Sequence, residues 1–583
     1  MIWRSRLAAL ARWVVVVAAA GVLALVAAAN LIVSPWRVFG LWWLVSSVGL
    51  VAMALLWRLA GPPATKLWRS LKLPRWALPT VLFFAFLVVK LIPALGLKTE
   101  QSWDFLAIYE AAKSLVAGDN SFTEIPYWDY FAYQTPSVLY EAGMLKLSGG
   151  STVPLLVVGA MAMAGINLLV FLAGRRITGS ASAGLLAAIA YLVFPGPYIQ
   201  APALSTDHLS TFLTYLGAYI ILAAAARTRL GQAVALGLAG GLALELGNLI
   251  RPMGPVMLAA ALAAVVVGVL TRRRCRPAAP PHTLTPVSAA GADAPPEGAA
   301  EPAPVADRGA VLGAATGVAP SAATRAALDL TPSGKRPAND PPQPGRQVRP
   351  LVAGLAAALV ALGAYTALGV GVDGIVRWTG VNPHGTKSNL PEWKFALGLA
   401  GRDEAEDVLV MTGAYDQEPA PNAHANIRAA LKRDLELLRE RWFYIAGRQV
   451  QLLWVNHDNA ILAFNPQLAD LKPSSVPNAR TDPLPYLMVV LERGLALPVV
   501  ILAAWGVVQL GRERRVGRVA AFLACLVIAY AAIHLAIEAM PRYRYPVMPA
   551  IFTLTAPALG RLAGVGPRRE GVTRTTAPPR LST

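Results

Sequence analysis

Long apolar runs, separated by polar segments, occur along most of this chain. Most of them are long enough to cross a hydrocarbon layer of about 30 Å as a helix. The runs cover residues 13–33, 39–57, 76–96, 152–173, 181–199, 208–226, 231–249, 252–270, 350–371, 484–508, 518–537 and 546–563. This pattern predicts an all-α polytopic membrane protein with about twelve transmembrane helices.

Two of the segments between the runs are long. Residues 97–151 contain two short amphipathic stretches joined by an aromatic connector, residues 127–133. Residues 372–483 contain a predicted helix around 424–454, with apolar positions spaced by three and four and charged positions on the opposite face. Such a helix is typical of one that lies in the membrane interface, although packing on other helices explains the pattern equally well.

A composition change divides the chain. Residues 274–349 are rich in Ala and Pro, which predicts a disordered cytoplasmic linker.

The apolar stretch in residues 1–33 is longer than that of a signal peptide, so we expect an uncleaved helix there. The predicted parts are two extra transmembrane helices in 1–75, a transmembrane core in 76–273, the linker 274–349, one transmembrane helix in 350–371, the region 372–483, three transmembrane helices in 484–563 and a cytoplasmic tail in 564–583.

Basic residues in the predicted loops indicate the orientation. With the N-terminus inside, segments rich in Arg and Lys alternate with segments poor in them, as the positive-inside rule requires. The sequence therefore predicts a multi-pass plasma-membrane protein with both termini cytoplasmic and with residues 97–151 and 372–483 outside. Basic cytoplasmic loops explain the formal net charge of +19, and no basic face accompanies a nucleic-acid-binding motif, so we expect no nucleic-acid partner.

The spacing of the cysteines and histidines indicates neither disulfide bonds nor a zinc site. The two cysteines, Cys275 and Cys525, lie in the linker and in an apolar run, so no disulfide framework is expected. No His/Cys cluster has the spacing of a zinc site. We expect neither a metal nor another cofactor.

Several polar clusters fall on the predicted outer side. They are Asp104, residues 127–136, residues 205–208, residues 245–248 with Arg251, and Glu538 with residues 541–546. Arginines on the outer face oppose the orientation rule, so they need a local reason. The planar guanidinium matches phosphate oxygens, and a lipid phosphate arriving from the outer leaflet would supply that reason.

Each of these residues also has a purely structural interpretation. Asp104 and Asp207 could cap the helices that follow them. Glu538 could pair with Arg542, four residues later, and the outer arginines could reach lipid headgroups. The aromatic connector could be an interfacial belt, and His208 alone indicates little. The gathering of all the clusters on one side favours a functional site.

Two patterns in these clusters resemble a known family. The pattern Asp104, Tyr109, Ala112, Leu115 and Gly118, followed by residues 130–136, resembles the first outer loop of bacterial family 39 glycosyltransferases. These are GT-C membrane enzymes related to protein O-mannosyltransferases and aminoarabinose transferases. Residues 249–252 and the series from Glu538 to residues 542–546 are similar to two later signatures of that family. The chain departs from the pattern where relatives have an acidic pair beside Asp104 and a double proline at 135–136.

The resemblance implies a function. The expected donor is a sugar on a polyprenyl phosphate, transferred with inversion at the outer membrane face, in contact with membrane lipids. Asp104 would be the catalytic base, Asp207 would orient a substrate, and Arg251 and Arg544, with Arg542, would bind the donor phosphate. The remaining expected substrate-binding residues are Tyr109, Tyr130, Tyr133, His208, Glu245, Asn248, Glu538 and Tyr545.

Two other functions compete with this one. A transporter or flippase of lipid-linked sugars would usually show repeats and broken helices near the membrane midplane, and no repeat is visible here. A glycan polymerase or ligase would use a diphosphate-linked donor. The sequence leaves the sugar open, and the acceptor can be a glycan, a lipid or a protein.

Overall fold

The computed structural model describes residues 2–34, 36–97, 99, 101, 103–271, 350–388, 392–399, 422–456 and 477–565. The predicted linker 274–349 and nearly all of the predicted tail lie outside these residues. Every regular element within the described residues is a helix, which confirms the predicted all-α fold.

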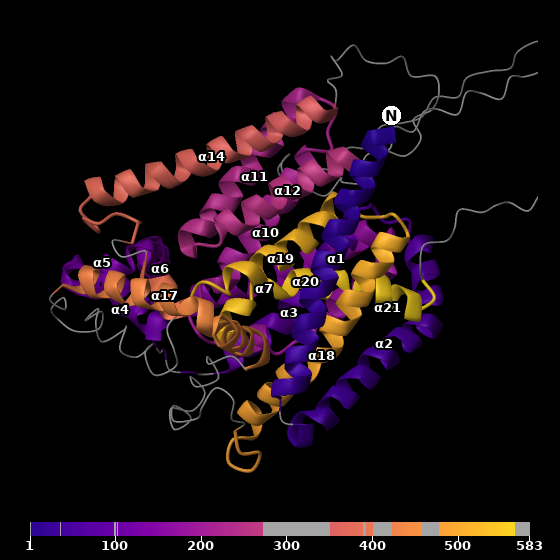
Figure 1. The fold of residues 1–583 in the computed structure, drawn as a ribbon, viewed down its shortest axis with the longest axis horizontal. Coiled ribbons are helices and arrows are strands. Elements are labelled where there is room, and N and C mark those ends of the chain that lie inside the picture. Colours follow the sequence, from indigo (N-terminus) through magenta and orange to yellow (C-terminus); the bar gives the residue numbers. More distant parts are fainter. Residues whose placement is uncertain are drawn as a thin grey trace, which may run out of the picture. The chain divides into compact units, whose positions relative to one another are not determined.

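Long apolar helices make up most of the described chain (Figure 1). Seven helices in this part are long and apolar enough to cross a membrane: α1 (Ile2–Val33), α2 (Trp36–Ser70), α3 (Ala77–Gly96), α7 (Val153–Thr178), α11 (Leu230–Ile250), α14 (Pro350–Trp378) and α18 (Pro483–Arg512). Further helices of the bundle are α8 (Ala181–Leu192), α10 (Asp207–Ala224), α12 (Gly254–Thr271) and α19 (Arg518–Ile533). The number of spans stays a prediction.

Proline interrupts two of the runs that were predicted as continuous helices. In the run 181–199, α8 is followed after Pro195 by the separate short helix α9 (Gly196–Gln200). In the run 546–563, the helices α20 (Met548–Leu554) and α21 (Ala556–Leu562) are separate, and Pro557 lies just after the break. Proline lacks an N–H group, and its ring crowds the carbonyl of the residue four positions earlier. The prediction of continuous helices was therefore wrong at these two places.

Small residues let three helices pack closely. A Cβ atom on Gly237 of α11 would lie 2.6 Å from the carbonyl oxygen of Ala357 in α14, and one on Gly217 of α10 would lie 2.7 Å from the Gly240 oxygen in α11. Close backbone approach at small residues is typical of helices that associate in a membrane. This packing positions α10, which begins at Asp207, and α11, which is followed by Arg251.

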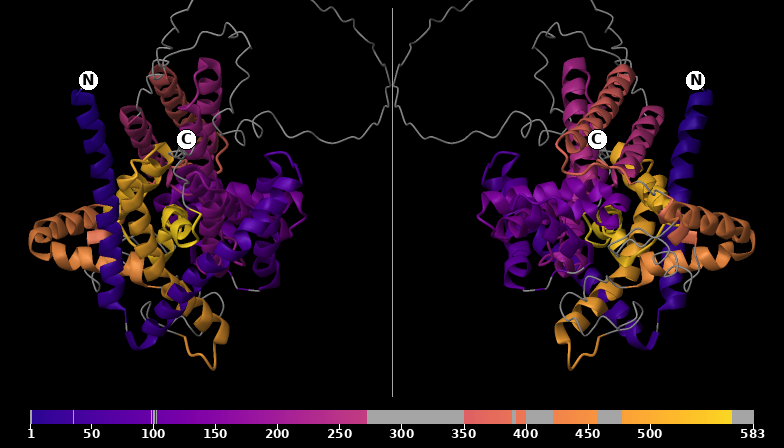
Figure 2. Two further views of the ribbon diagram at one scale, coloured as in Figure 1. Left: turned by 90° about the vertical axis from the view of Figure 1, so that its right-hand side faces the viewer. Right: turned by 90° about the vertical axis from the view of Figure 1, so that its left-hand side faces the viewer.

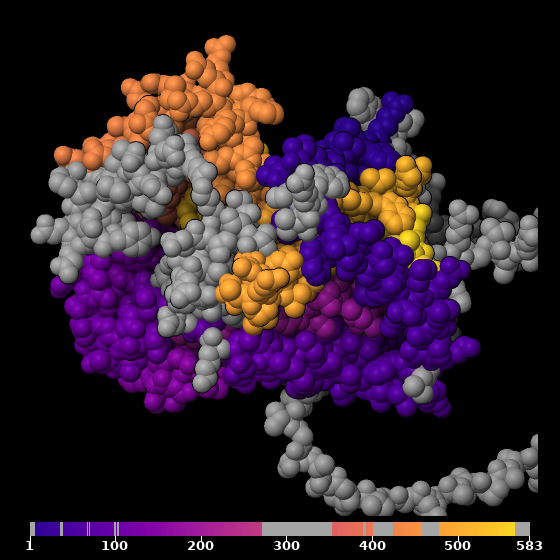
Figure 3. Space-filling model, turned by 90° about the horizontal axis from the view of Figure 1, so that it is seen from below, coloured from indigo at the N-terminus to yellow at the C-terminus, as the bar shows by residue number. Residues whose placement is uncertain are grey.

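The two N-terminal helices are joined to α18 by a buried arginine. The Arg493 side chain lies over the Phe39 ring at 3.8 Å and donates a hydrogen bond to the Ser34 hydroxyl at 3.1 Å. The Trp43 indole donates in turn to the Arg493 carbonyl at 3.1 Å. In Figure 3 the indigo atoms of α1 and α2 border the orange-to-yellow atoms of the C-terminal part. These helices therefore pack as part of the same bundle.

A second hydrophobic cluster forms at one end of the bundle. It combines α4 (Trp103–Val116), α5 (Pro126–Tyr130), α6 (Thr135–Leu147), α15 (Trp393–Leu399) and the start of α17 (Ala423–Val450). Phe131 meets the Trp393 ring edge-on at 4.9 Å, and Ile427 of α17 is fully buried in the cluster. Beyond this contact Leu435 and Trp442 are exposed on α17, which lies at the edge of the bundle in both views of Figure 2. The exposed apolar face suits a membrane interface.

Candidate functional site

Four charged side chains from distant parts of the sequence meet in one cluster, here called the charged cluster: Asp104, Asp207, Arg251 and Arg542. Arg542 donates a hydrogen bond to Asp104 Oδ2. Arg251 lies between the two carboxylates, with Nη1 3.9 Å from Asp104 Oδ2 and Nε 2.5 Å from Asp207 Oδ1. All four side chains are at most 17% exposed. Two cations and two anions thus balance each other in a largely buried site.

Helix ends place these side chains. Asp104 lies in the first turn of α4, and Asp207 is the first residue of α10, where the helix dipole favours carboxylates. Arg251 follows the last residue of α11 with φ −145° and ψ 131°. The next residue, Pro252, favours this extended conformation and ends the helix. Arg542 belongs to a short 3₁₀ helix, η6 (Pro541–Arg544), that connects α19 to α20.

The arginines control the ionisation of Asp104. Burial alone would raise the pKa of this carboxyl, but the charges of Arg542 and Arg251 lower it to about 2. The Tyr127 hydroxyl lies 3.1 Å from Asp104 Oδ1 and adds a further polar contact. Asp104 is therefore ionised at neutral pH, and its carboxylate is held by Arg542 from one side and by Tyr127 from the other.

Both arginines retain buried N–H groups that bond to nothing within the described residues. These groups are Nη2 of Arg251 and Nε of Arg542. A buried donor without a partner costs free energy, so such a site is suited to bind an anion with several acceptor oxygens. The charged cluster thus places two guanidinium groups beside the Asp104 carboxylate.

A second ion pair extends the charged cluster. Lys394 Nζ lies 2.5 Å from Glu538 Oε2, and the Tyr543 hydroxyl is 3.1 Å from the same oxygen. Although burial lowers the pKa of Lys394, the Glu538 carboxylate raises it above its ordinary value. The charge of Lys394 in turn helps to lower the pKa of Asp104. Glu538 was predicted from the sequence, whereas its main partner Lys394 was not.

The predicted tyrosines have different surroundings. Tyr133 has an electrostatic effect on Arg251 and Lys394, which indicates that it lies near the charged cluster. Tyr130 is buried among the aromatic side chains of the second hydrophobic cluster, and the Tyr109 ring contacts Lys113 at 5.3 Å. Tyr127, which contacts Asp104, was missed. It stood in the aromatic connector, but only the short turn α5 decides which ring faces the carboxylate.

The predicted phosphate ligand Arg544 is placed elsewhere. It forms an ion pair with Glu492 of α18 and donates to the Asn456 carbonyl, and it is buried. The structure therefore does not bring Arg544 together with Asp104, although its neighbour Arg542 contacts that carboxylate directly. Its role in donor binding stays a prediction from the resemblance.

The pair of Arg544 and Glu492 gives a test of that role. We expect Arg544→Met to lower the free energy of unfolding by about 3–5 kcal/mol, because it leaves Glu492 buried without its cation. The double variant Arg544→Met/Glu492→Leu should recover most of this loss. Thermal unfolding in detergent measures both. A loss of transfer by Arg544→Met with unchanged stability would instead support direct phosphate binding.

The other predicted residues join helices. His208 Nδ1 lies 2.8 Å from the Tyr545 hydroxyl, which links α10 to the segment after η6. Asn248 donates to Glu245 at 3.1 Å, and its own oxygen accepts from the Gly254 amide at 2.9 Å. These contacts hold α11 and α12 at the base of the Arg251 turn. They support the position of the charged cluster without touching it.

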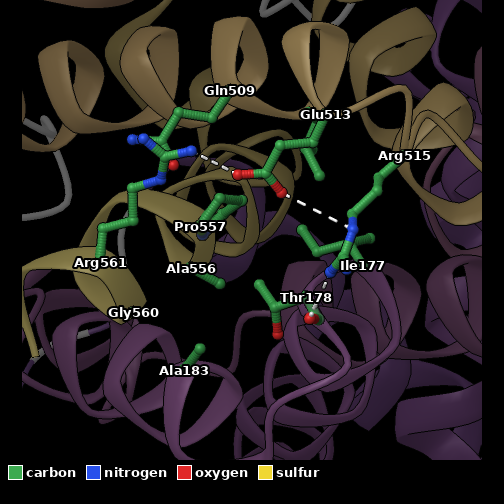
Figure 4. A pocket seen from close by; sticks show the side chains of 11 residues that line it. Ile177, Thr178, Ala183, Gln509, Glu513, Arg515, Ala556, Pro557, Gly560 and Arg561 are labelled. Atoms are coloured by element: carbon green, nitrogen blue, oxygen red, sulfur yellow. Dashed lines mark hydrogen bonds and ion pairs between the residues drawn. The ribbon is translucent and has the colours of Figure 1, made fainter. Parts of the chain in front are cut away.

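A pocket in another part of the bundle is occupied by internal ion pairs (Figure 4). Glu513 accepts from Arg561 and lies 3.7 Å from Arg515 Nε, and Arg515 also donates to the Thr178 carbonyl at 3.3 Å. These contacts connect α7, α18 and α21. Since the carboxylate and both cations already interact with each other, we interpret this site as a contact between helices.

No group of three or more His, Cys, Asp or Glu side chains able to hold a metal ion occurs in the part of the chain that the structure describes.

Comparison with known proteins gives a family match over residues 138–285, which run from α6 past the end of α12 and contain Asp207 and Arg251. No curated protein and no solved structure matches the chain.

The fold and this match together indicate the class. The apolar helices and the match over residues 138–285 support a multi-pass membrane glycosyltransferase of the GT-C type. The matching family is described as dolichyl-phosphate-mannose-protein mannosyltransferase. The match confirms the resemblance inferred from the sequence, and it includes residues 249–252, one of the signatures on which that resemblance was based.

Proposed function

We propose that the protein transfers a sugar from a polyprenyl-phosphate donor to a cell-envelope acceptor at the outer face of the plasma membrane, with inversion and with Asp104 as the general base. The observation that carries this proposal is the charged cluster, in which one carboxylate lies against two arginines that retain buried donors. A base beside an anion site is the combination that this reaction requires.

The bond changes assign a role to each member of the cluster. The acceptor hydroxyl oxygen attacks the anomeric carbon, and its proton passes to Asp104. The bond from the anomeric carbon to the phosphate oxygen breaks, and its electrons remain on the released polyprenyl phosphate. Arg251 and Arg542 stabilise this growing negative charge. Asp207, 2.5 Å from Arg251, orients that guanidinium, and Tyr133 borders the sugar.

Donor binding would also activate the base. In the free protein the pKa of Asp104 is about 2, which is low for a general base. A phosphate that accepts hydrogen bonds from Arg542 and Arg251 competes with Asp104 for those cations and adds a nearby negative charge. Both effects raise the pKa of Asp104. Proton abstraction would therefore begin only after the donor has bound.

The predicted orientation supports transfer on the outer side. Arg and Lys residues concentrate in the segments predicted to be cytoplasmic. The charged cluster belongs to α4, η6, the start of α10 and the end of α11, all of which are predicted to face outside. The exposed apolar side chains of α17, near the same end, suit contact with membrane lipids.

A transfer assay tests the proposal. Purified protein is incubated with radiolabelled polyprenyl-phosphate mannose, glucose or arabinose and with membrane extract as the source of acceptors. We expect one donor to give a labelled product, whose chemistry identifies the acceptor as glycan, lipid or protein. Product from a diphosphate-linked oligosaccharide alone would indicate a polymerase or ligase. Movement of the donor across vesicle membranes without a covalent product would indicate a flippase.

A further inference from the structure

A small polar pocket lies beside the charged cluster and has no part in the mechanism above. Its polar lining consists of Tyr140 and Glu141 of α6 with residues 205, 206 and 208, and side chains that include Leu155 and Leu204 form its apolar wall. Glu141 is fully buried, and neither of its carboxyl oxygens has a hydrogen-bond partner. The Thr206 hydroxyl is also buried and without a partner.

These groups can both donate and accept hydrogen bonds. Burial raises the pKa of Glu141 to about 8, although Arg251 partly opposes the shift. Glu141 is therefore mostly a neutral carboxylic acid at neutral pH, with one O–H donor and free acceptor sites. The Thr206 hydroxyl has the same dual character. Buried polar groups of this kind are nearly always satisfied in the working state of a protein, which indicates a ligand.

The pocket adjoins the reaction site. The charge of Arg251 acts on Glu141, so the two side chains are neighbours. Asp207, which pairs with Arg251, lies in the chain between Thr206 and His208. The pocket has about the room that one water molecule occupies. It therefore fits a single hydroxyl group and is too small for a whole sugar ring.

We propose that Glu141 and Thr206 form a recognition site for one hydroxyl group of the transferred sugar, occupied by water when no donor is bound. The inference rests on the proposed function, since it assigns this site to the donor sugar. A hydroxyl group can donate to one of these residues and accept from the other. A site built to bond a hydroxyl rejects an analogue that lacks it, so these residues would contribute to the choice of sugar.

A binding experiment separates the sugar from the lipid phosphate. Wild type and Thr206→Val are titrated with short-chain polyprenyl-phosphate mannose, polyprenyl-phosphate arabinose and bare polyprenyl phosphate. We expect Thr206→Val to bind a sugar-bearing lipid about tenfold more weakly and to bind the bare lipid as wild type does. Thr214→Val is the matched control, because Thr214 lies on α10, the helix that Thr206 precedes, and its hydroxyl already bonds to the Ser210 carbonyl at 2.9 Å.

A second pair of variants covers the case in which Thr206→Val does not fold. Glu141→Gln keeps a donor and an acceptor and should preserve the preference for a sugar-bearing lipid. Glu141→Leu should abolish it. Equal affinity of wild type for sugar-bearing and bare lipids, or variants that leave the preference unchanged, would show that the pocket holds water only. Absence of transfer by wild type, with this binding preference intact, would overturn the proposed function and leave the pocket in place.

Discussion

Asp104→Asn should reduce sugar transfer by about 10²–10⁴-fold while the protein still folds and binds its donor. The amide has the shape of the carboxylate but cannot accept the proton of the attacking hydroxyl. It also releases Arg542, which pairs with Asp104 in the free protein. Because both guanidinium groups then become more available to a phosphate, we expect the variant to bind polyprenyl-phosphate sugar at least as tightly as wild type.

Two measurements on the same preparations make this result specific. Transfer is followed with the labelled donor, and donor binding is followed by the shift in melting temperature. Glu110→Gln is the matched control, since Glu110 lies on the same helix and forms an exposed ion pair with Lys113 at 2.9 Å. Full activity of Asp104→Asn would exclude this carboxylate as the base. A joint loss of binding and transfer would point to a structural role.

The sequence was sufficient to predict the class of protein and part of the site. Apolar runs gave the all-α membrane fold. Asp104, Asp207 and Arg251 were predicted because they stand at the ends of such runs, where a helix end and a following proline determine their position. Each of them belongs to the charged cluster in the structure. The positions of residues at helix ends can therefore be predicted from the local sequence pattern alone.

The directions in which side chains point from short turns could not be predicted from the sequence. Residues 541–544 form η6, and a 3₁₀ helix turns by about 120° per residue. Consequently Arg542 contacts Asp104, while Arg544 contacts Glu492. Both arginines were predicted to have the same role, because nothing in the run of alternating Arg and Tyr distinguishes them.

Residues within apolar helices were missed for another reason. Glu141 lies on α6, a helix with little separation between polar and apolar faces, so its burial could not be inferred from periodicity. Lys394 depends on Glu538, a residue far away in the sequence. Such pairs are created by the packing of distant helices, which a single sequence does not specify. The structure therefore adds the second ion pair and the Glu141 pocket.

Arg542→Gln should weaken donor binding and reduce transfer by about 10²–10³-fold. The glutamine removes one of the two cations that would face the donor phosphate. It also removes the group that contributes most to lowering the pKa of Asp104. The pKa of Asp104 in the free protein should therefore rise from about 2, so that the carboxylate becomes protonated at a higher pH.

The direction of this pKa shift of Asp104 can be tested separately, through the pH dependence of the protein's stability. A carboxylate with a lowered pKa stabilises the folded protein above its unfolded pKa, and this stabilisation is lost as the pH falls toward the folded pKa. In wild type the contribution of Asp104 should be lost between pH values of about 4 and 2. In Arg542→Gln this contribution should be largely absent, because the folded pKa lies closer to the unfolded one. Melting temperatures across this pH range measure the difference.

Arg561→Gln is the control for the charge change. Arg561 pairs with Glu513 at the pocket of Figure 4 and is about half exposed, so its loss should leave donor binding and the acid response unchanged. Arg542→Lys keeps the charge but not the planar fork, and we expect an intermediate loss. Unchanged donor affinity in Arg542→Gln would exclude this arginine from the phosphate site. The phosphate would then depend on Arg251 alone, and Arg542 would serve only to hold Asp104 in its ionised form.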